Sequence, residues 1–495
     1  MGSLALSRVV LPPLLRRTRR LPVVLVATLA LFTAGAQAVY ALPPALTQVS
    51  TDPFSGPSTS QHKTELEPDT FAFGSTIVAA FQVGRVPDGG SSDIGWATSK
   101  DKGATWTNGF LPRLTGQTGG PFQRASDPSV AFDQAHNVWM ISSLGVNVPG
   151  SNAVLTSRST DGGLTWSNPV TVATGSLDKN WIVCDNSSSS PFVGHCYTQF
   201  DVTSAGNAIR LSTSTNGGVS WGPSIGNSSG ASGLGGQPVV RPNGTVIVPH
   251  LSGSQIRSFR SIDGGQSWRA TVVVANVSHH NTAGRLRVNE PLPSAEIDSA
   301  GTVYLAWPDC RFRSSCASND IVFSQSTSET TWAAPTRVPI DAVSSAVDHF
   351  TPGIGVDSSR AGSTARIGLT YYYYPTANCS SATCQLDVGY VSSTNGGATW
   401  SAPTQLAGPM TLSWLPDTTQ GRMFGDYIST SVVSGGNAFQ ALPVAFAPSG
   451  STFNQAMYVP TGGLAITGGS LRSAASENVQ PQASPTRATA SQTAN

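Results

Sequence analysis

Acidic or polar side chains recur along this chain at the starts of short apolar runs, each beside a proline or an aromatic residue. The starts are Glu67-Pro68, Asp127-Pro128, Asp178 to Trp181, Gln237-Pro238, Glu290-Pro291, Thr351-Pro352 and Asp426-Tyr427. If these runs are strands around a channel, the acidic residues form a polar ring at its mouth. Trp181, Trp307 and Trp414 would offer faces on which sugar rings stack. The residue types therefore favour a channel that binds glycans.

The elements that must position these residues are marked by a repeated turn phrase, Ser159 to Trp166 with the sequence Ser-Thr-Asp-Gly-Gly-Leu-Thr-Trp. Further copies lie at Ser99 to Trp106, Ser214 to Trp221, Ser261 to Trp268 and Ser393 to Trp400, with a degenerate copy at Ser326 to Trp332. An Asp or Asn before Gly-Gly folds back onto backbone N–H groups while the glycines take positive φ, which closes a hairpin. We expect Asp161 and Asn216 to be such braces. The tryptophan should be buried between sheets with its N–H directed at a partner.

The order of these features within each unit predicts an all-β propeller. Each start is followed by alternating apolar runs, then by the turn phrase, then by an edge strand that tolerates proline, as at Pro169 to Val172. The seventh unit, from Tyr427, lacks the last two features, and residues 43–49 carry the missing edge pattern. We therefore predict seven four-stranded blades, with six as the alternative, closed by an N-terminal strand.

Composition narrows the class of protein. The net charge is +1 and 11% of residues are charged, so there is no basic surface for nucleic acid. With 51 glycines and 34 prolines, helices should be rare. The six cysteines form three close pairs, Cys184 with Cys196, Cys310 with Cys316 and Cys379 with Cys384. None has the spacing of a zinc or redox site, so we expect three disulfides in an oxidising compartment and no metal or cofactor.

The two ends of the chain are compositionally distinct. Arg16 to Arg20 precede an apolar run from Leu21 to Phe32 and a small-residue cleavage site at Ala36 to Ala38, which predicts a secretory signal peptide over residues 1–38. Residues 469–495 are rich in Ser, Ala, Thr and Gln and predict a disordered tail. The propeller is expected over residues 39–468, in a secreted monomer with no membrane span after cleavage.

The turn phrase with its tryptophan resembles the Asp box of the sialidase superfamily, and the resemblance extends over roughly residues 46–468. Sialidases hold a sugar carboxylate with three arginines, use a tyrosine activated by a glutamate as nucleophile, and use an aspartate as acid/base. An anionic substrate needs bidentate cations, and a phenol needs a base beside it. The resemblance thus implies an exo-glycosidase acting on extracellular glycans.

The resemblance also implies candidate site residues. In the fifth unit, Glu290 and Arg311 match the activating glutamate and one triad arginine, and Trp307 lies between them on the same unit. In the first unit, Arg85 ends a strand that resembles the one before the catalytic aspartate, for which Asp88 and Asp93 are the candidates.

The last unit adds Arg422 as a substrate cation and Tyr427 as the nucleophile. Two positions depart from the sialidase pattern. Glu67-Pro68-Asp69 stands where the family has its first triad arginine, and Gln385 stands where the third is expected. Loss of two charge-assisted contacts would weaken carboxylate binding.

Three functions remain open on the sequence alone. The chain is a glycosidase of the sialidase type, a non-catalytic glycan-binding propeller, or a scaffold that presents loops to a protein partner.

Overall fold

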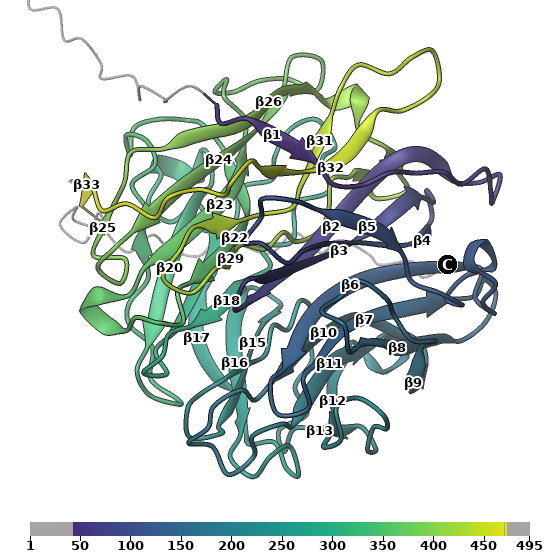
Figure 1. Cartoon of the computed structure of the whole chain (residues 1–495). Helices are drawn as coiled ribbons and strands as arrows, with labels where there is room; N and C mark the ends of the chain where they lie inside the picture. The colour runs from purple at the N-terminus through teal and green to yellow at the C-terminus, as the bar shows by residue number, and fades with distance from the viewer. Residues whose placement is uncertain (1–42, 470, 473–495) are drawn as a thin grey trace, which may run out of the picture. The chain divides into compact units, whose positions relative to one another are not determined.

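The computed structural model describes residues 43–469 and 471–472, which belong to one compact unit. Strands run in chain order through successive antiparallel groups (Figure 1). The predicted signal peptide and most of the predicted tail lie outside the described residues. Leu471 and Arg472, assigned to the tail from the sequence, form the short strand β33 (Leu471–Arg472) against β25 (Thr399–Trp400). These two residues therefore belong to a strand rather than to a tail.

Each group is a four-stranded meander in which consecutive strands pair. The first two groups are β2 (Gln61–Phe73), β3 (Thr76–Arg85), β4 (Ser91–Ser99), β5 (Thr107–Phe110), and β6 (Arg124–Asp133), β7 (Val138–Val146), β8 (Asn152–Ser159), β9 (Val170–Gly175). The third and fourth are β10 (Leu177–Cys184), β11 (Cys196–Val202), β12 (Ala208–Ser214), β13 (Ile225–Gly226), and β14 (Val239–Val240), β15 (Val246–Ser252), β16 (Gln255–Ser261), β17 (Val272–Asn276). The fifth and sixth are β18 (Ser294–Ile297), β19 (Val303–Asp309), β20 (Asp320–Ser326), β21 (Thr336–Arg337), and β22 (His349–Val356), β23 (Ile367–Tyr373), β24 (Gln385–Ser393), β26 (Thr404–Thr411).

The last group is completed by the N-terminal strand. Unlike the six groups above, it consists of a separate two-stranded pair, β29 (Ser431–Val432) and β30 (Ala438–Phe439), followed by the paired strands β31 (Leu442–Ala445), β32 (Gln455–Pro460) and β1 (Leu46–Gln48). β1 pairs antiparallel with β32, with Leu46 opposite Pro460, and the Val49 N–H donates to the Met457 carbonyl at 2.9 Å. The expected pairing of the N-terminal strand with the last unit is confirmed. It removes an exposed sheet edge on which other chains could pair.

The first strands of all these groups line one cavity of about 490 Å³. Residues of β2, β6, β10, β14, β18, β22 and β29 contribute to its wall. Successive meanders whose first strands surround a common channel are a β-propeller, so the predicted all-β propeller class is confirmed. Seven blades remain a prediction, which these seven strands support.

Short connections complete the chain. A two-residue hairpin pair, β27 (Asp417–Thr418) and β28 (Gly421–Arg422), precedes the last group. The helices of the described part are five three-residue 3-10 turns: η1 (Gly116–Thr118), η2 (Thr203–Ala205), η3 (Ser314–Cys316), η4 (Gly362–Thr364) and η5 (Leu412–Trp414). None of the helices in the described part is long and apolar enough to cross a membrane. The expected scarcity of helix holds for these residues.

The turn phrases fold as the sequence indicates. Asp161 Oδ1 accepts the N–H groups of Leu164 and Thr165, both at 3.0 Å, while Gly162 and Gly163 take φ of 85° and 84°. Asn216 braces its turn in the same manner, accepting the Ser220 N–H at 3.0 Å. These local bonds satisfy backbone donors that the hairpin would otherwise leave open.

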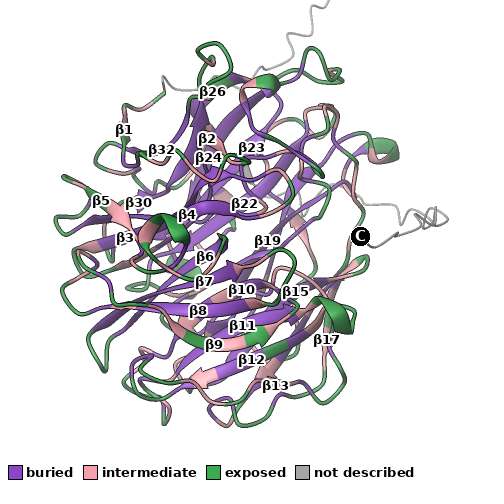
Figure 2. Ribbon diagram, turned by 90° about the vertical axis from the view of Figure 1, so that its right-hand side faces the viewer, coloured by how far each residue is buried: buried purple, intermediate pink, exposed green. Residues whose placement is uncertain are grey.

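The tryptophans of the phrases pack between neighbouring sheets. Trp166 and Trp96 lie in one apolar cluster with residues of β3 and β7, and their ring centroids are 6.4 Å apart. Buried strands and exposed loops alternate through the molecule (Figure 2). The expectation that each indole N–H finds a partner is wrong for Trp166, Trp221 and Trp268, whose Nε1 atoms are buried without one among the described residues. Their contribution is apolar burial.

All three expected disulfides are present: Cys184–Cys196, Cys310–Cys316 and Cys379–Cys384. The first links β10 to β11. The other two join cysteines that are six and five positions apart in the sequence and so close short loops. Disulfides are characteristic of oxidising compartments, so their presence is consistent with an extracellular protein.

Candidate functional site

The acidic unit starts lie at irregularities in the first strands of the groups. Glu67, Asp127 and Lys179 have positive φ values of 56°, 48° and 53°. Strand pairing shifts register at each of these positions, between Leu66 and Asp69 and at the equivalent places in β6 and β10. Such bulges turn a side chain away from the regular alternation of a strand, at a cost of about 1–3 kcal/mol for each strained residue. Strained bulges in several first strands are typical of a functional site.

Glu67 links the first unit to the last. Its Oε1 accepts the backbone N–H of Asp426 at 3.2 Å, and its Oε2 accepts Nε2 of Gln82. The other end of the Gln82 amide, Oε1, accepts Arg85 Nη1 at 2.9 Å. Burial, followed by the charge of Asp426, raises the pKa of Glu67 to about 8. Glu67 therefore holds Arg85 in place through Gln82.

Asp426 is the anion of this cluster. Its Oδ2 is bound by Lys179 Nζ and by Arg287 Nη2, the latter at 2.6 Å. Burial alone would raise the pKa of Asp426, but Lys179 and Arg287 hold it below its usual range. The two cations and this carboxylate form a buried ion network between units that are far apart in sequence.

A second set of carboxylates has raised pKa values. Burial, followed by the charge of Asp127, raises the pKa of Asp178 to about 7. Burial and the charge of Asp178 raise that of Asp201 to about 8, and both oxygens of Asp201 lack a hydrogen-bond partner among the described residues. Asp178 is half-buried, whereas Asp127 and Asp201 are buried. Asp178 is thus a carboxylic acid that can exchange its proton near neutral pH and reach solvent.

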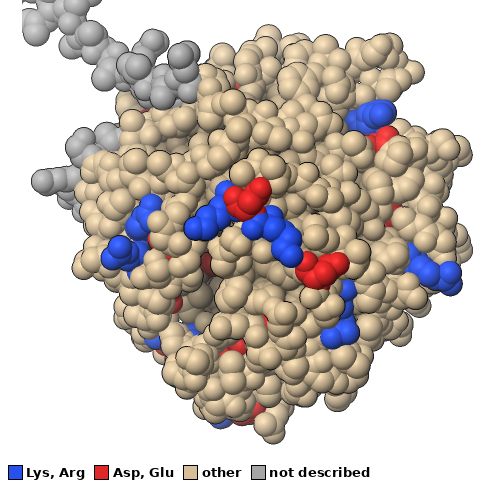
Figure 3. All heavy atoms as spheres, in the orientation of Figure 1, with Lys and Arg blue, Asp and Glu red and all other residues tan. Residues whose placement is uncertain are grey.

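These groups surround a cavity of about 410 Å³, whose charged lining includes Glu67, Arg85, Asp88, Asp127, Asp178, Lys179 and Arg287. A second cavity of about 220 Å³ shares Arg287 and Gln420 with the first and is also lined by Glu290 and Asp426. Charged side chains are otherwise sparse over the face of the molecule shown in Figure 3. The two adjoining cavities are the candidate site.

Two cationic side chains are available to a ligand in the larger cavity. Arg85 Nε is buried without a hydrogen-bond partner in the described part of the chain, and the charges of Arg85 and Arg287 act on one another. Two guanidinium groups that face one cavity favour an anionic group between them. This arrangement suits a carboxylate or a similar anion.

Several residues predicted from the sequence lie at this site. Arg85 and Asp88 line the larger cavity, and Glu290 lines the smaller one. Asp88 is exposed and pairs with Arg124 at 2.7 Å on the rim. The acidic ring expected at the unit starts is found here for Glu67, Asp127, Asp178, Glu290 and Asp426.

Other predicted residues lie in the interior with their polar atoms engaged. Asp93 is buried, and its Oδ2 accepts the hydroxyls of Thr115 and Thr118 at 2.9 and 2.7 Å. Trp307 is fully buried in an apolar cluster, and its Nε1 donates to Asp309 at 3.1 Å. No ring face of Trp307 is open for a sugar, so we leave Asp93 and Trp307 out of the proposed site.

Arg311 and Arg422 contact other residues of the chain. Arg311 Nη2 binds Asp309 Oδ2 at 2.6 Å and also the Asn276 carbonyl. The Arg422 carbonyl accepts the Arg287 N–H at 2.9 Å, so its main chain positions Arg287. Neither side chain lines the two cavities of the candidate site.

Tyr427 does not have the environment of a nucleophile. Its hydroxyl donates to the Pro128 carbonyl at 2.9 Å, and its ring packs edge-on against Trp181 with centroids 5.0 Å apart. Burial and the charges of Glu67 and Asp127 hold the pKa of Tyr427 well above its usual value. A phenol whose hydroxyl donates to a backbone carbonyl and whose pKa is raised is poorly activated.

Sequence reasoning did not select Lys179, Arg287 and Asp201 as site residues. Lys179 follows Asp178 in a recognised unit start, so its position was visible although its role was not. Arg287 lies three residues before Glu290, outside the repeated pattern. Asp201 is in a second strand, β11, where no repeated feature marks it.

Neither a protein-family model nor a curated protein sequence matches the chain. Among solved structures, the chain is similar to a Hadza microbial sialidase, Hz136, with 14% identity over 81% of this chain and 66% of that one, at a TM-score of 0.43. It is also similar to a protein of unknown function from Dyadobacter fermentans (16% identity, 70% and 99% coverage, TM-score 0.44) and to the intramolecular trans-sialidase from Ruminococcus gnavus (13%, 83% and 96%, 0.39). The chain thus spans just under two thirds of the length of Hz136.

Proposed function

We propose that this chain is a glycoside hydrolase that acts on an anionic sugar of extracellular glycans, as the sialidase resemblance of its turn phrases implies. The observation that carries the proposal is the meeting of Arg85, Arg287 and Asp178 at one cavity. The two arginines bind the anionic group of the sugar, and Asp178 is the proton donor beside it. The three disulfides support secretion as the setting.

Asp178 acts as general acid. Hydrolysis of a glycosidic bond needs a carboxylic acid that protonates the leaving oxygen and a second carboxylate that assists attack on the anomeric carbon. With a pKa raised to about 7 by burial and Asp127, Asp178 is substantially protonated at neutral pH. Glu290, exposed on the adjoining cavity, is the second carboxylate. Burial first, and then the charges of Asp178 and, more weakly, Glu290, raise the pKa of Asp201.

Glu67, Lys179 and Asp426 are positioning residues in this account. Their bonds fix Arg85 and Arg287 at the cavity wall, so the substrate anion meets preorganised donors.

The experiment is a release assay over sialylated and uronic-acid glycans with the wild type and the Asp178→Asn and Glu290→Gln variants. Asp88→Asn is the matched control, because Asp88 lines the same cavity but is exposed and paired on the rim. We expect sugar release by the wild type and the control, and a loss of roughly 100-fold or more in each site variant. Wild type that releases no sugar from any anionic glycan contradicts the proposal.

A second function, glycan binding without turnover, is favoured by one observation. Tyr427, the candidate nucleophile, has its hydroxyl on a backbone carbonyl and a raised pKa. In that case the wild type binds anionic glycans saturably, Arg85→Met weakens binding, and no sugar is released.

A further inference from the structure

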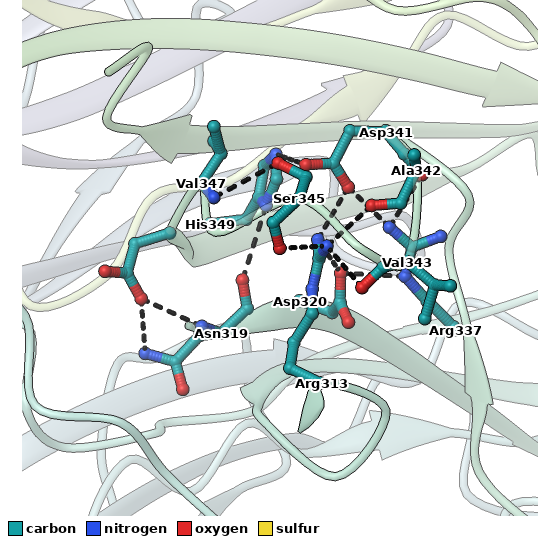
Figure 4. A network of polar contacts seen from close by, with 11 residues as sticks. Arg313, Asn319, Asp320, Arg337, Asp341, Ala342, Val343, Ser345, Val347 and His349 are labelled. Carbon is teal, nitrogen blue, oxygen red and sulfur yellow. Dashed lines mark hydrogen bonds and ion pairs between the residues drawn. The ribbon is translucent and has the colours of Figure 1, made fainter. Parts of the chain in front are cut away.

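Three potential ligand atoms converge beside the fifth and sixth sheets, away from the cavities described above. They belong to Asp320, Asp341 and His349 (Figure 4). One ligand atom from each of these residues lies within 4.8 Å of the others. In the same network Asp320 Oδ2, Asp341 Oδ2 and His349 Nε2 are buried and lack a hydrogen-bond partner among the described residues, and His349 Nε2 lies 4.0 Å from Asp341 Oδ2. Buried polar atoms without partners are costly, so three in one place need an explanation.

All three atoms are acceptors. His349 Nδ1 faces the Asn319 carbonyl at 3.3 Å, which places the ring proton on Nδ1 and a lone pair on Nε2. His349 is fully buried. The carboxylates of Asp320 and Asp341 contribute two further lone-pair atoms. His349 Nε2 and Asp341 Oδ2, 4.0 Å apart, are two acceptors that repel unless a cation or a donor lies between them.

The other oxygens of the two carboxylates are already bound. Arg313 Nη2 binds Oδ1 of Asp341 at 2.6 Å and also Oδ1 of Asp320, and Arg337 bridges the same two oxygens. Asp320 and Arg313 are almost completely buried. Both Oδ1 atoms are therefore satisfied and both carboxylates are fixed in orientation, with Oδ2 left over in each case.

One neutral donor lies nearby and is insufficient. The donor is the Ser345 hydroxyl beside the Asp341 carboxylate. A single hydroxyl proton cannot satisfy three acceptors on three residues. The remaining occupant is a water molecule or a metal ion.

We propose that Asp320, Asp341 and His349 bind a divalent transition-metal ion of the Zn²⁺ class. One imidazole nitrogen and two carboxylate oxygens are a suitable ligand set for such an ion. Hydrogen bonds from outside a metal site commonly orient its ligands. Here His349 Nδ1 faces a backbone carbonyl, and Oδ1 of each carboxylate forms an ion pair with Arg313.

The site would join two neighbouring sheets. Asp320 begins β20, Asp341 follows β21, and His349 begins β22, so the ligands come from the fifth sheet, the connection after it and the sixth sheet. Arg313 lies in the loop closed by Cys310–Cys316, which supports the site from outside. The sequence suggested no metal because the ligands are scattered over thirty residues and include no cysteine and a single histidine.

The two arginines set a limit on affinity, because their charges already balance the two carboxylates. Binding is nonetheless testable on the intact chain without any activity assay. The probe is Zn²⁺ added to chelator-treated protein, followed by calorimetric titration and by metal analysis after desalting. Competition with Co²⁺, read by its visible absorption, reports the ligand geometry.

We expect one Zn²⁺ per chain and a rise in melting temperature with Zn²⁺. His349→Ala and the milder His349→Gln should both abolish this binding. His250→Ala is the matched control. His250 is fully buried, with Nδ1 at 3.3 Å from the Val248 carbonyl oxygen, and within the described part of the chain its Nε2 has no hydrogen-bond partner and it belongs to no group of potential metal ligands. This control should retain one Zn²⁺.

Wild type that binds no Zn²⁺ would mean that water fills the site, which overturns the proposal even if the His349 variants fail to fold. Equal binding by wild type and His349→Gln would place the ion elsewhere and overturns it as well. Binding of Ca²⁺ in preference to Zn²⁺ would contradict the transition-metal assignment.

Discussion

The backbone N–H of Asp426 donates to Oε1 of Glu67 at 3.2 Å across 359 residues of chain. This bond joins the start of the last unit to the start of the first, at the mouth of the channel. It also holds together the framework that presents Arg85 and Arg287 to the cavity. The contact between the last unit and the first therefore also contributes to the candidate site.

Arg85→Met should weaken binding of anionic glycans. The substitution keeps an unbranched side chain at this buried position but removes a charged donor whose Nε has no hydrogen-bond partner among the described residues. We expect affinity to fall roughly 10- to 100-fold, measured by titration with a sialylated oligosaccharide. Arg124→Met, which removes a cation that pairs with Asp88 on the rim, should change affinity little. Equal losses in the two variants would mean that the cavity attracts anions only by general charge.

Gly425→Ala should destabilise the protein and disturb the site. Gly425 has φ of 143°, and a Cβ there would lie 2.8 Å from Glu67 Cα and 2.9 Å from the Tyr427 carbonyl oxygen. We expect a loss of about 1–3 kcal/mol in unfolding free energy, measured with urea. Gly435→Ala is the control for positive φ alone, since that glycine has φ of 69° and open space around it. Gly435→Ala should cost less, and a larger loss there would contradict the close-approach argument.

Glu65→Gln should alter how stability depends on pH. Burial, partly offset by the Ser50 hydroxyl, raises the pKa of Glu65 from 4.5 to about 7. The folded state therefore holds this proton more tightly than the unfolded state does. The stabilisation is complete below about pH 4.5 and is lost as pH rises through about 7.

The measurement is urea unfolding of wild type and Glu65→Gln between pH 4.5 and 8.5. Between pH 4.5 and 8.5 the free energy of unfolding of the wild type should fall by up to about 3 kcal/mol more than that of the variant, because glutamine does not titrate. Other titrating groups are common to both proteins and cancel in the difference. Parallel pH profiles would show that Glu65 is ionised in the fold.

Removal of the Cys184–Cys196 disulfide by a double Cys→Ser change should lower stability. Its two cysteines are 12 residues apart and join β10 to β11. Loop-closure entropy predicts a cost of about 3 kcal/mol, against about 2 kcal/mol for the Cys379–Cys384 pair with its separation of 5. Thermal unfolding of both double variants tests the order, and a larger loss for Cys379–Cys384 would contradict it.

The sequence predicted the parts of the fold that depend on local chemistry. The braces at Asp161 and Asn216 involve residues within four positions, so the phrase itself determines them. The pairing of β1 with β32 was also predictable, because the last unit lacked an edge strand that the N-terminus carried. The sequence did not predict that the N–H groups of Trp166, Trp221 and Trp268 lack a hydrogen-bond partner among the described residues. The surroundings of each ring come from a neighbouring sheet, which no local pattern specifies.

The candidate site was only partly predictable for the same reason. The carboxylates of the polar ring occupy repeated positions and were recognised from their spacing. The pairing of Lys179 with Asp426 spans 247 residues, and no local pattern encodes it. Tyr427 had the right type and position for a nucleophile, but its hydroxyl partner lies in another unit and is a backbone carbonyl. Residue type alone could not predict this contact of the hydroxyl.

The role of Asp178 as general acid is tested most directly by comparing two substrates of the same sugar, one with a natural glycosidic linkage and one with an activated aryl leaving group. An activated leaving group departs without protonation, so it does not need the acid. We expect Asp178→Asn to lose roughly 100-fold or more in kcat/KM on the natural linkage and to retain most of its activity on the aryl glycoside. An equal loss on both substrates, or no loss on either, would contradict the account.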